Sequence, residues 1–272
     1  MIPKIVNISG GRTSGYMAYL CKGKPHHHFV FQNTGREREE TLVFLNEMDK
    51  RWNLNLVWQE YDVNEDNKPI CKVVTFETAN RDGSVFEKII DRYGKIPSID
   101  QRFCTDKLKT GTGHSYIRKT LGLEKWYHYI GIRADEGKRL EKYNKEWIGK
   151  RIKYKRLLPL AMLGVTMKDV ADFWRESDFD LQLPMLPNGK TVGGNCKGCF
   201  FHSEYQHAML CRNSPEDVDW LIKQEDKIGQ TFNHGKSWRE IREQSVKQQL
   251  EMFSDELEAE LYCDSELGSC GI

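Results

Sequence analysis

The stretch Ser9-Gly10-Gly11-Arg12-Thr13-Ser14 lies between the apolar run Ile5 to Ile8 and the helix-like run Tyr16 to Leu20. This order predicts a strand, a glycine turn and the N-terminus of a helix. Adjacent glycines let the backbone approach a ligand closely, and the free N–H groups and dipole of a helix N-terminus favour an anion. The hydroxyls in this stretch can add further contacts. Two interpretations are open at this point: a loop that binds phosphate or sulfate, or a turn that only joins a strand to a helix.

Length and charge narrow the class of protein. The chain has 272 residues, with 41 basic and 40 acidic side chains and a net charge of +1. This size suits one substantial domain with an appendage. The charge balance gives no general argument for binding to nucleic acid or to membranes, although a local basic patch is compatible with it. Apolar runs are far shorter than the roughly 18 residues of a membrane span, and the N-terminus lacks a signal-peptide core. We therefore expect a cytoplasmic protein without a membrane partner.

Short apolar runs rich in β-forming residues alternate with helix-like stretches such as Glu37 to Trp52. The runs that we expect to form strands are Ile5 to Ile8, Phe29 to Phe31, Leu54 to Trp58 and Trp126 to Ile130. This alternation predicts an α/β fold with an open, mostly parallel sheet and helices on both of its faces. We assign residues 1–182 to this nucleotide-binding domain and residues 183–272 to a helical C-terminal part that contains cysteines. Between Asp62 and Asp100 we expect an insertion around one helix, Val85 to Tyr93.

Two more loops are expected at the same edge of the sheet as residues 9–14. The first, residues 33–37, follows the second predicted strand, and the other, residues 131–136, follows the strand that ends at Ile130. Ligands of open α/β sheets bind at the carboxyl ends of the strands. Guanidinium groups suit bidentate contacts with phosphate or sulfate, which makes Arg133 and Arg139 candidate ligands. We expect the three loops to converge on one anion. The alternative is three unrelated loops with surface arginines.

Four stretches resemble, in this order, the phosphoadenosine phosphosulfate (PAPS) reductase family: residues 9–14, 33–41, 102–109 and 131–139. This family belongs to the adenine nucleotide alpha-hydrolase-like superfamily, together with the PP-loop ATP pyrophosphatases and the thiolation enzymes for DNA and tRNA. The chain looks most similar to phage and prophage members. The resemblance implies that an adenine nucleotide, ATP or PAPS, lies across the sheet. The candidate nucleotide-binding residues are Ser9, Gly10, Gly11, Arg12, Thr13, Ser14, Asn33, Thr34, Gly35, Gly131, Arg133 and Arg139.

One position departs from the pattern of the superfamily. The loop of the pyrophosphatases normally carries an aspartate before its last serine, where this chain has Thr13. An aspartate would help to hold magnesium near the phosphates, whereas a threonine is a much weaker ligand. The sequence therefore predicts anion binding and leaves open both a bound Mg²⁺ ion and the cleavage of ATP.

The spacing of Cys196 and Cys199 is the strongest local signal for a metal. Two thiolates two residues apart around a glycine can bind one ion or cluster. Cys263 and Cys270 flank a polar turn that can bring a second pair together. The resemblance implies that these four cysteines form one group, for which Cys211 is a substitute ligand. A 4Fe-4S cluster is the expected cofactor and zinc is the alternative. The remaining interpretation is a pair of buried, reduced cysteines.

Cys104 lies between Arg102 and Lys107 at the expected start of a helix. Cations and a helix N-terminus both lower the pKa of a thiol, so we predict that Cys104 is a reactive thiolate. In relatives with a cluster, however, the matching position supplies a cluster ligand. Both roles stay open, and an inert core cysteine is the third alternative. Lys107 and Arg133 complete the set of candidate catalytic residues. The C-terminal tail partly resembles the mobile segment of PAPS reductases, which makes Cys270 a secondary candidate nucleophile.

These features favour an enzyme that couples an adenine nucleotide to sulfur transfer. The nucleotide would activate an oxygen or carbonyl group as its adenylate, and sulfur would arrive through Cys104 or the cluster. One alternative is a thiol-dependent PAPS reductase that releases sulfite. Another is a nucleotide-sensing protein without turnover. The expected partners are the nucleotide substrate, a sulfur donor or thioredoxin-like reductant, and a nucleic acid as sulfur acceptor.

Overall fold

The computed structural model describes residues 1–145 and 154–247 of the chain. In these residues the chain forms a six-stranded sheet in the order β4-β3-β2-β1-β5-β6. Neighbouring strands are parallel, except that β4 runs antiparallel to β3. The strands are β1 (Lys4–Asn7), β2 (His27–Asn33), β3 (Val57–Val63), β4 (Pro69–Val74), β5 (Trp126–Tyr129) and β6 (Tyr154–Leu157).

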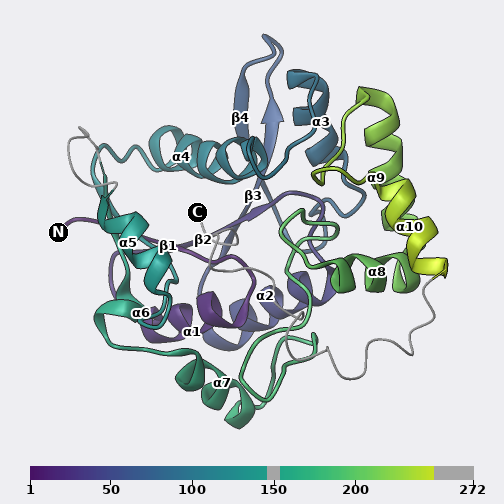
Figure 1. Cartoon of the computed structure of the whole chain (residues 1–272). Coiled ribbons are helices and arrows are strands. Elements are labelled where there is room, and N and C mark those ends of the chain that lie inside the picture. The colour runs from purple at the N-terminus through teal and green to yellow at the C-terminus, as the bar shows by residue number, and fades with distance from the viewer. Residues whose placement is uncertain (146–153, 248–272) are drawn as a thin grey trace.

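The helices of the described residues surround this sheet (Figure 1). Those before β6 are α1 (Arg12–Cys21), α2 (Glu39–Trp52), α3 (Ser84–Tyr93), η1 (Cys104–Gly111), α4 (Thr112–Ser115), η2 (Tyr116–Thr120) and α5 (Gly137–Lys145). Those after β6 are α6 (Pro159–Met162), α7 (Met167–Glu176), α8 (Glu204–Asn213), α9 (Pro215–Ile228) and α10 (Trp238–Lys247). The segment of residues 104–120 is continuous and helical, with π-helical turns at η1 and η2.

Both faces of the sheet are covered, because successive side chains of a strand point to opposite faces. Val6 and Ile8 pack in one cluster with α1, α2 and α7, where Trp174 is fully buried. Ile5 packs on the opposite face, in a cluster with Ile117 of η2. Figure 1 shows α1 and α2 on one side of the sheet and the segment around α4 on the other. The expected open, mostly parallel sheet with helices on both faces is confirmed.

The expected insertion contains more structure than one helix. Its helix is present as α3, but β4 also forms and pairs with β3 in a register that places Pro69 opposite Val63. Sequence analysis missed β4 because it is a short edge strand with a proline at its start and several exposed positions. Proline is tolerated at the first residue of an edge strand, where its missing N–H costs no ladder hydrogen bond.

The C-terminal part contains the expected helices, α8, α9 and α10, and they pack against α3. Ile90 of α3 lies in one apolar cluster with Leu210 of α8, Leu221 of α9 and the fully buried Trp238 of α10. Figure 1 shows α8, α9 and α10 together beside the sheet. The boundary between residues 182 and 183 stays a prediction.

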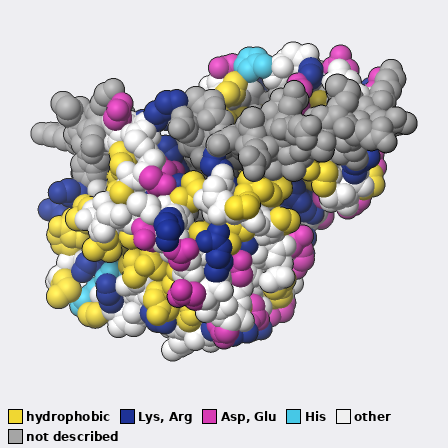
Figure 2. All heavy atoms as spheres, turned by 60° about the horizontal axis from the view of Figure 1, so that its bottom comes forward, with side chains coloured by type: hydrophobic (Ala, Val, Ile, Leu, Met, Phe, Trp, Pro, Cys, Tyr) yellow, Lys and Arg dark blue, Asp and Glu magenta, His cyan; other side chains and the backbone are white. Residues whose placement is uncertain are grey.

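None of the described helices combines the length and the apolar character that crossing a bilayer requires. Figure 2 shows basic and acidic side chains interspersed over the face that carries α1, α2 and α7, with apolar side chains between them. This mixture agrees with the balanced net charge of the chain.

Candidate functional site

A cavity of about 190 Å³ lies where β1 and β5 end. β2 and β3 follow β1 on one side, whereas β5 and β6 lie on its other side. The direction of the strand order therefore reverses between β1 and β5, and such switch points are where open α/β sheets bind ligands. Of the predicted nucleotide-binding residues, those that line this switch-point cavity are Ser9, Gly11, Arg12, Thr13, Ser14, Gly131, Arg133 and Arg139.

The N-terminus of α1 faces this cavity without a side-chain cap. Gly11 is the N-cap residue and offers no side chain to the N–H groups of the first turn. Such unpaired N–H groups suit an anionic ligand. The Ser14 hydroxyl accepts a hydrogen bond from the backbone N–H of Ser9 at 3.1 Å and donates one to the carbonyl of Gly11 at 2.9 Å, which fixes the loop. A Cβ atom at Gly131 would lie 3.3 Å from the Cα atom of Ser14, so glycine lets the two loops approach closely.

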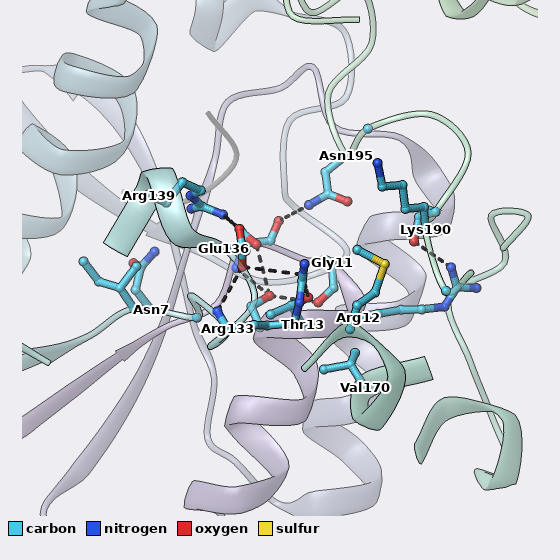
Figure 3. A pocket seen from close by; sticks show the side chains of 18 of the residues that line it. Asn7, Gly11, Arg12, Thr13, Arg133, Glu136, Arg139, Val170, Lys190 and Asn195 are labelled. Carbon is cyan, nitrogen blue, oxygen red and sulfur yellow. Dashed lines mark hydrogen bonds and ion pairs between the residues drawn. The ribbon is translucent and has the colours of Figure 1, made fainter. Parts of the chain in front are cut away.

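Arg133 and Arg139 form a cationic wall beside this helix terminus (Figure 3). The Nη1 atom of Arg133 donates to the Thr13 hydroxyl at 3.1 Å, and its Nε atom donates to Asp135 at 2.9 Å. Glu136 pairs with Arg139 and accepts a hydrogen bond from the backbone N–H of Arg133 at 2.9 Å. Both guanidinium groups are thus held in place by neighbouring carboxylates. Fixed guanidinium groups next to a helix N-terminus suit phosphate or sulfate.

Arg12 uses its guanidinium differently from the prediction. It forms an ion pair of 2.6 Å with Asp180, donates to the Thr191 hydroxyl at 2.7 Å, and donates to the carbonyls of Leu181 and Leu183. The side chain is only 5% exposed. Arg12 therefore connects the loop of residues 9–14 to a segment some 170 residues later, and its contact with a nucleotide stays a prediction.

The loop of residues 33–37 does not reach the switch-point cavity. The Asn33 amide donates to Glu60 at 2.7 Å, and Thr34 donates to Glu37 through its backbone N–H and its hydroxyl. β2, which carries this loop, lies on the side of β1 that faces away from β5. The structure therefore brings two of the three predicted loops together at one cavity. Gly35 lines neither this cavity nor the second one described below.

A second cavity, of about 60 Å³, is lined by three of the cysteines that were singled out from the sequence. Cys104, Cys196 and Cys199 line it together with Thr34 and Lys109. Aromatic side chains make up much of the remaining wall, namely Phe86, Phe200, Phe201, Trp220 and Phe232. The lining of this cysteine cavity is therefore largely apolar, with the three thiols and the cationic side chains of Arg36, Lys109 and Lys197 among it.

The predicted lowering of the pKa of Cys104 is wrong. Burial raises the pKa of this thiol, and the nearby cations of Lys109 and Arg102 oppose the rise only in part. Phe103 and Cys104 both pack against the apolar cluster around Leu108, where a thiolate loses its hydration. Desolvation of this kind favours the neutral thiol.

The lysines that line the cysteine cavity are Lys109 and Lys197, whereas the sequence singled out Lys107. Lys107 forms an ion pair with Asp106 and is not among the residues that line either cavity. The ammonium group of Lys109 lies 3.9 Å from the Sγ atom of Cys196, which is also 3.7 Å from a carboxylate oxygen of Glu37. Residues two apart on a helical segment point in different directions. Lys107 and Lys109 could therefore be distinguished only by knowing which face of η1 is turned toward the cavity.

The predicted metal ligands are only partly visible. Cys196 and Cys199 line the cysteine cavity, and Cys263 and Cys270 lie outside the described residues. Within residues 1–145 and 154–247 no three His, Cys, Asp or Glu side chains are placed to hold a metal ion. Cys211 packs instead against the apolar cluster of the C-terminal helices. Thiolates are the ligands that iron–sulfur clusters require, so the three thiols of the cavity fit the donor type of a cluster.

Residues 193–199 connect the two cavities. Gly193, Gly194 and Asn195 line the switch-point cavity, and the next four residues line the cysteine cavity. The side-chain amide of Asn195 donates to the carbonyl of Ser9 at 2.9 Å. The backbone carbonyl of Asn195 accepts a hydrogen bond from the backbone N–H of Arg38 at 2.9 Å. No pattern in the sequence indicated Asn195, apart from its place beside Cys196. This connecting segment puts a phosphate-binding loop and a thiol cluster next to each other.

Two comparisons with known proteins show which family this chain resembles. A family model described as phosphoadenosine phosphosulfate reductase domain matches residues 4–186. The chain is also similar to the "Uncharacterized nin region protein ORF290" of Escherichia phage lambda, with 31% identity over 219 residues, which are 77% of this chain and 69% of that protein. The range of the family model includes both loops of the switch-point cavity and Cys104, whereas Cys196 and Cys199 lie beyond it. By the extent of this match, the chain belongs to the phosphoadenosine phosphosulfate reductase family.

Proposed function

We propose that this protein is an enzyme that binds an adenine nucleotide in the switch-point cavity and uses it to drive sulfur transfer at the cysteine cavity. The observation that carries this proposal is the connecting segment, residues 193–199, which contributes to both cavities. Asn195 faces the first cavity and Cys196, its neighbour in the chain, faces the second. Nucleotide activation and sulfur chemistry therefore fit into one composite site.

The first step would activate the sulfur acceptor. An acceptor oxygen attacks the α-phosphorus of ATP, a new oxygen–phosphorus bond forms, and the bond from that phosphorus to pyrophosphate breaks. The N–H groups of α1 and the guanidinium of Arg133 would stabilise the negative charge that develops on the phosphates. Thr13, which accepts a hydrogen bond from Arg133 at 3.1 Å, would hold that guanidinium in place. This arrangement supplies positive charge at the position where related loops use an aspartate to help hold Mg²⁺.

The second step would deliver the sulfur. The terminal sulfur of a persulfide on Cys104, loaded by a separate sulfur donor, attacks the activated carbon; the bond from carbon to AMP breaks. Attack by a second thiol of the cavity on Cys104 then releases the acceptor as a thiol and leaves a disulfide, which a thioredoxin-like reductant returns to two thiols. A nucleic acid is the acceptor class that we propose. A 4Fe-4S cluster would be held by Cys196 and Cys199 with the pair Cys263 and Cys270, and when bound would supply sulfide or electrons. The thiol that attacks Cys104 would then come from the reductant.

The family match favours a second candidate, the reduction of PAPS. In this reaction the Cys104 thiolate attacks the sulfur of the sulfonate, a sulfur–sulfur bond forms, and adenosine 3′,5′-bisphosphate leaves. A second thiol then attacks Cys104, which forms a disulfide and releases sulfite. The same two cavities would serve this reaction, with the nucleotide in the first and the thiols in the second.

Product analysis under anaerobic conditions distinguishes the two candidates. The protein is incubated with ATP, a persulfide donor and tRNA or DNA, and separately with PAPS and a thioredoxin system. Release of AMP and pyrophosphate together with thiolated nucleic acid supports sulfur transfer, whereas sulfite from PAPS supports the reductase. The Cys104→Ser variant should bind nucleotide normally and lose either reaction. Cys71→Ser is the control, because Cys71 lies on the edge strand β4 and lines neither cavity. If the wild-type protein forms neither product, both candidates are contradicted.

A further inference from the structure

We propose that a third cavity, between α8 and α10, binds the nucleobase of the nucleic acid that accepts the sulfur. The inference rests on the proposed function, because it gives a place to the acceptor of that reaction. The cavity has a volume of about 240 Å³ and is lined by side chains of α8, of α10 and of residues 232–234 and 236. Its lining residues, apart from Ile99, lie beyond residues 4–186, the range of the family model. The third cavity is therefore formed mainly by the C-terminal part of this chain.

Two buried histidines join the third cavity to the connecting segment. Both His202 and His207 line the cavity. The Nε2 atom of His202 accepts a hydrogen bond at 3.2 Å from the backbone N–H of Gly194, which lines the switch-point cavity. The Nε2 atom of His207 donates at 3.0 Å to the carbonyl of Cys199, which lines the cysteine cavity. A ligand in the third cavity therefore lies beside both parts of the composite site.

Planar rings form much of the wall of the third cavity. Phe200 and Phe232 line this cavity and the cysteine cavity alike. The ring of His207 is held against Trp238, with ring centres 4.8 Å apart. Unpaired nucleobases bind to proteins by stacking on such rings. Because the two phenylalanines are shared, a base that stacks on them lies next to the thiols.

The polar groups of the third cavity suit a neutral ligand. Its charged side chains, Glu204 and Lys236, form an ion pair of 2.5 Å with each other. Burial lowers the pKa of His202 to about 3, which keeps this ring neutral. Asn233 contributes a buried Nδ2 donor that has no hydrogen-bond partner among the described residues. The edge of a nucleobase presents the ring nitrogens and carbonyl oxygens that such a donor requires.

A neighbouring cavity gives room for the backbone of a polynucleotide. This cavity, of about 420 Å³, shares Asn233 and His234 with the third cavity. The exposed Lys95 lines it, together with the neutral polar side chains of Ser98, Gln101, Gln230 and Thr231. A base in the third cavity can therefore continue into a sugar-phosphate chain beside a cation. Single-stranded nucleic acid suits this arrangement, because no base pair has to open before the base enters.

Fluorescence anisotropy with labelled single-stranded DNA of about 12 nucleotides tests this role, with AMP present to fill the switch-point cavity. One strand has a mixed sequence, and the other is the same strand without its bases. We expect wild-type protein to bind the intact strand about tenfold more tightly than the abasic strand. Ala208→Phe places a ring inside the third cavity and should remove this preference, with abasic binding and AMP binding unchanged. Asn233→Ala should reduce the preference about threefold.

Met209→Phe and Asn213→Ala are the matched controls, because both residues belong to α8 and neither lines the third cavity. Both variants should keep the wild-type preference. Equal binding of the two strands by wild-type protein would overturn the inference, and so would an unchanged preference in Ala208→Phe and Asn233→Ala.

Calorimetry with nucleosides and with AMP separates the remaining outcomes. Nucleoside binding that Ala208→Phe weakens, without a preference of wild-type protein for the intact strand, would assign the third cavity to a free nucleoside and overturn the acceptor role. Absence of AMP binding to wild-type protein would overturn the proposed function, whichever strand is preferred.

Discussion

His128 is a buried histidine of β5 whose two ring nitrogens have no hydrogen-bond partner among the described residues. It lies close to His114 of α4, with ring centres 6.3 Å apart. Burial lowers the pKa of His128 to about 3, and nearby His114 and Arg156 act in the same direction. Burial also lowers the pKa of His114 to about 4. Both rings are therefore neutral in the folded protein at neutral pH.

His128→Leu should make the protein less sensitive to acid. As the pH falls below the ordinary histidine value of 6.5, the unfolded chain takes up a proton that the folded protein does not accept until about pH 3. Folding stability is therefore lost as the pH falls through this window. Replacement by leucine removes up to about 1.4 kcal/mol of this loss per pH unit. Urea unfolding at pH 7, 6 and 5 measures the slope.

The control for this series is His234→Asn, a substitution of an exposed histidine beside Asp100. At pH 7 the leucine variant should be at least as stable as wild-type protein, because no hydrogen bond within the described residues is lost. The same pH slope in wild-type protein and His128→Leu would show that His128 is not kept neutral by folding.

At the scale of residues, motif-based prediction succeeded where neighbours along the chain decide the environment. Ser14 and Thr13 lie at the cavity because the strand, glycine turn and helix place them there. Arg12 belongs to the same motif, yet its guanidinium pairs with Asp180. No local pattern indicates a partner so distant in the sequence. The raised pKa of Cys104 has the same origin, because burial depends on how distant segments pack.

At the scale of elements, the turn at Gly198 positions the cysteine cavity against α9. Gly198 has a φ angle of +67°, and an added Cβ atom would overlap the side chain of Leu221. Gly198→Ala combines backbone strain with overpacking and should lower the free energy of unfolding by about 2–4 kcal/mol. Thermal and urea unfolding measure this loss, and alkylation of Cys196 and Cys199 reports on the opening of the cavity.

Gly122→Ala separates the two causes. Gly122 has a similar φ angle of +65°, but nothing lies within 4 Å of an added Cβ atom there. Gly122→Ala should therefore lower the free energy of unfolding by the backbone strain alone, about 1 kcal/mol. If both variants lose the same stability, the contact between Gly198 and Leu221 does not position the cysteine loop.

The order of elements was predictable and their arrangement in the sheet was not. Short apolar runs indicated the parallel strands, and apolar residues at helical spacing indicated the helix α2. The spacing of apolar residues reflects which face of an element is buried. The reversal of strand order between β1 and β5 is a long-range property. Two of the three predicted loops line the cavity at this reversal, and the loop of residues 33–37 is not among its lining residues. The binding of one ligand by all three loops stays a prediction.

At the scale of the whole molecule, the cysteine cavity leads to a prediction about cofactor content. Protein purified without oxygen should contain iron and sulfide in cluster stoichiometry and absorb in the blue, because thiolates of Cys196 and Cys199 suit a cluster. Cys196→Ser should lose this absorption, whereas Cys71→Ser should keep it. Metal and sulfide analysis together with absorption spectra measure the outcome. A colourless protein with stoichiometric zinc would contradict the cluster and favour the alternative metal.

The central claim is that an adenine nucleotide binds where the N-terminus of α1 meets the cationic wall. Isothermal titration calorimetry with AMP on wild-type protein, Arg133→Gln and Arg175→Gln tests it most directly. Arg133 faces the cavity, whereas Arg175 is an exposed arginine of α7 that does not line it. Loss of charge-assisted hydrogen bonds should weaken binding to Arg133→Gln by about 10-fold to 100-fold and leave Arg175→Gln like wild-type protein. Absence of AMP binding to wild-type protein, or equal affinity in wild-type protein and Arg133→Gln, would contradict the account.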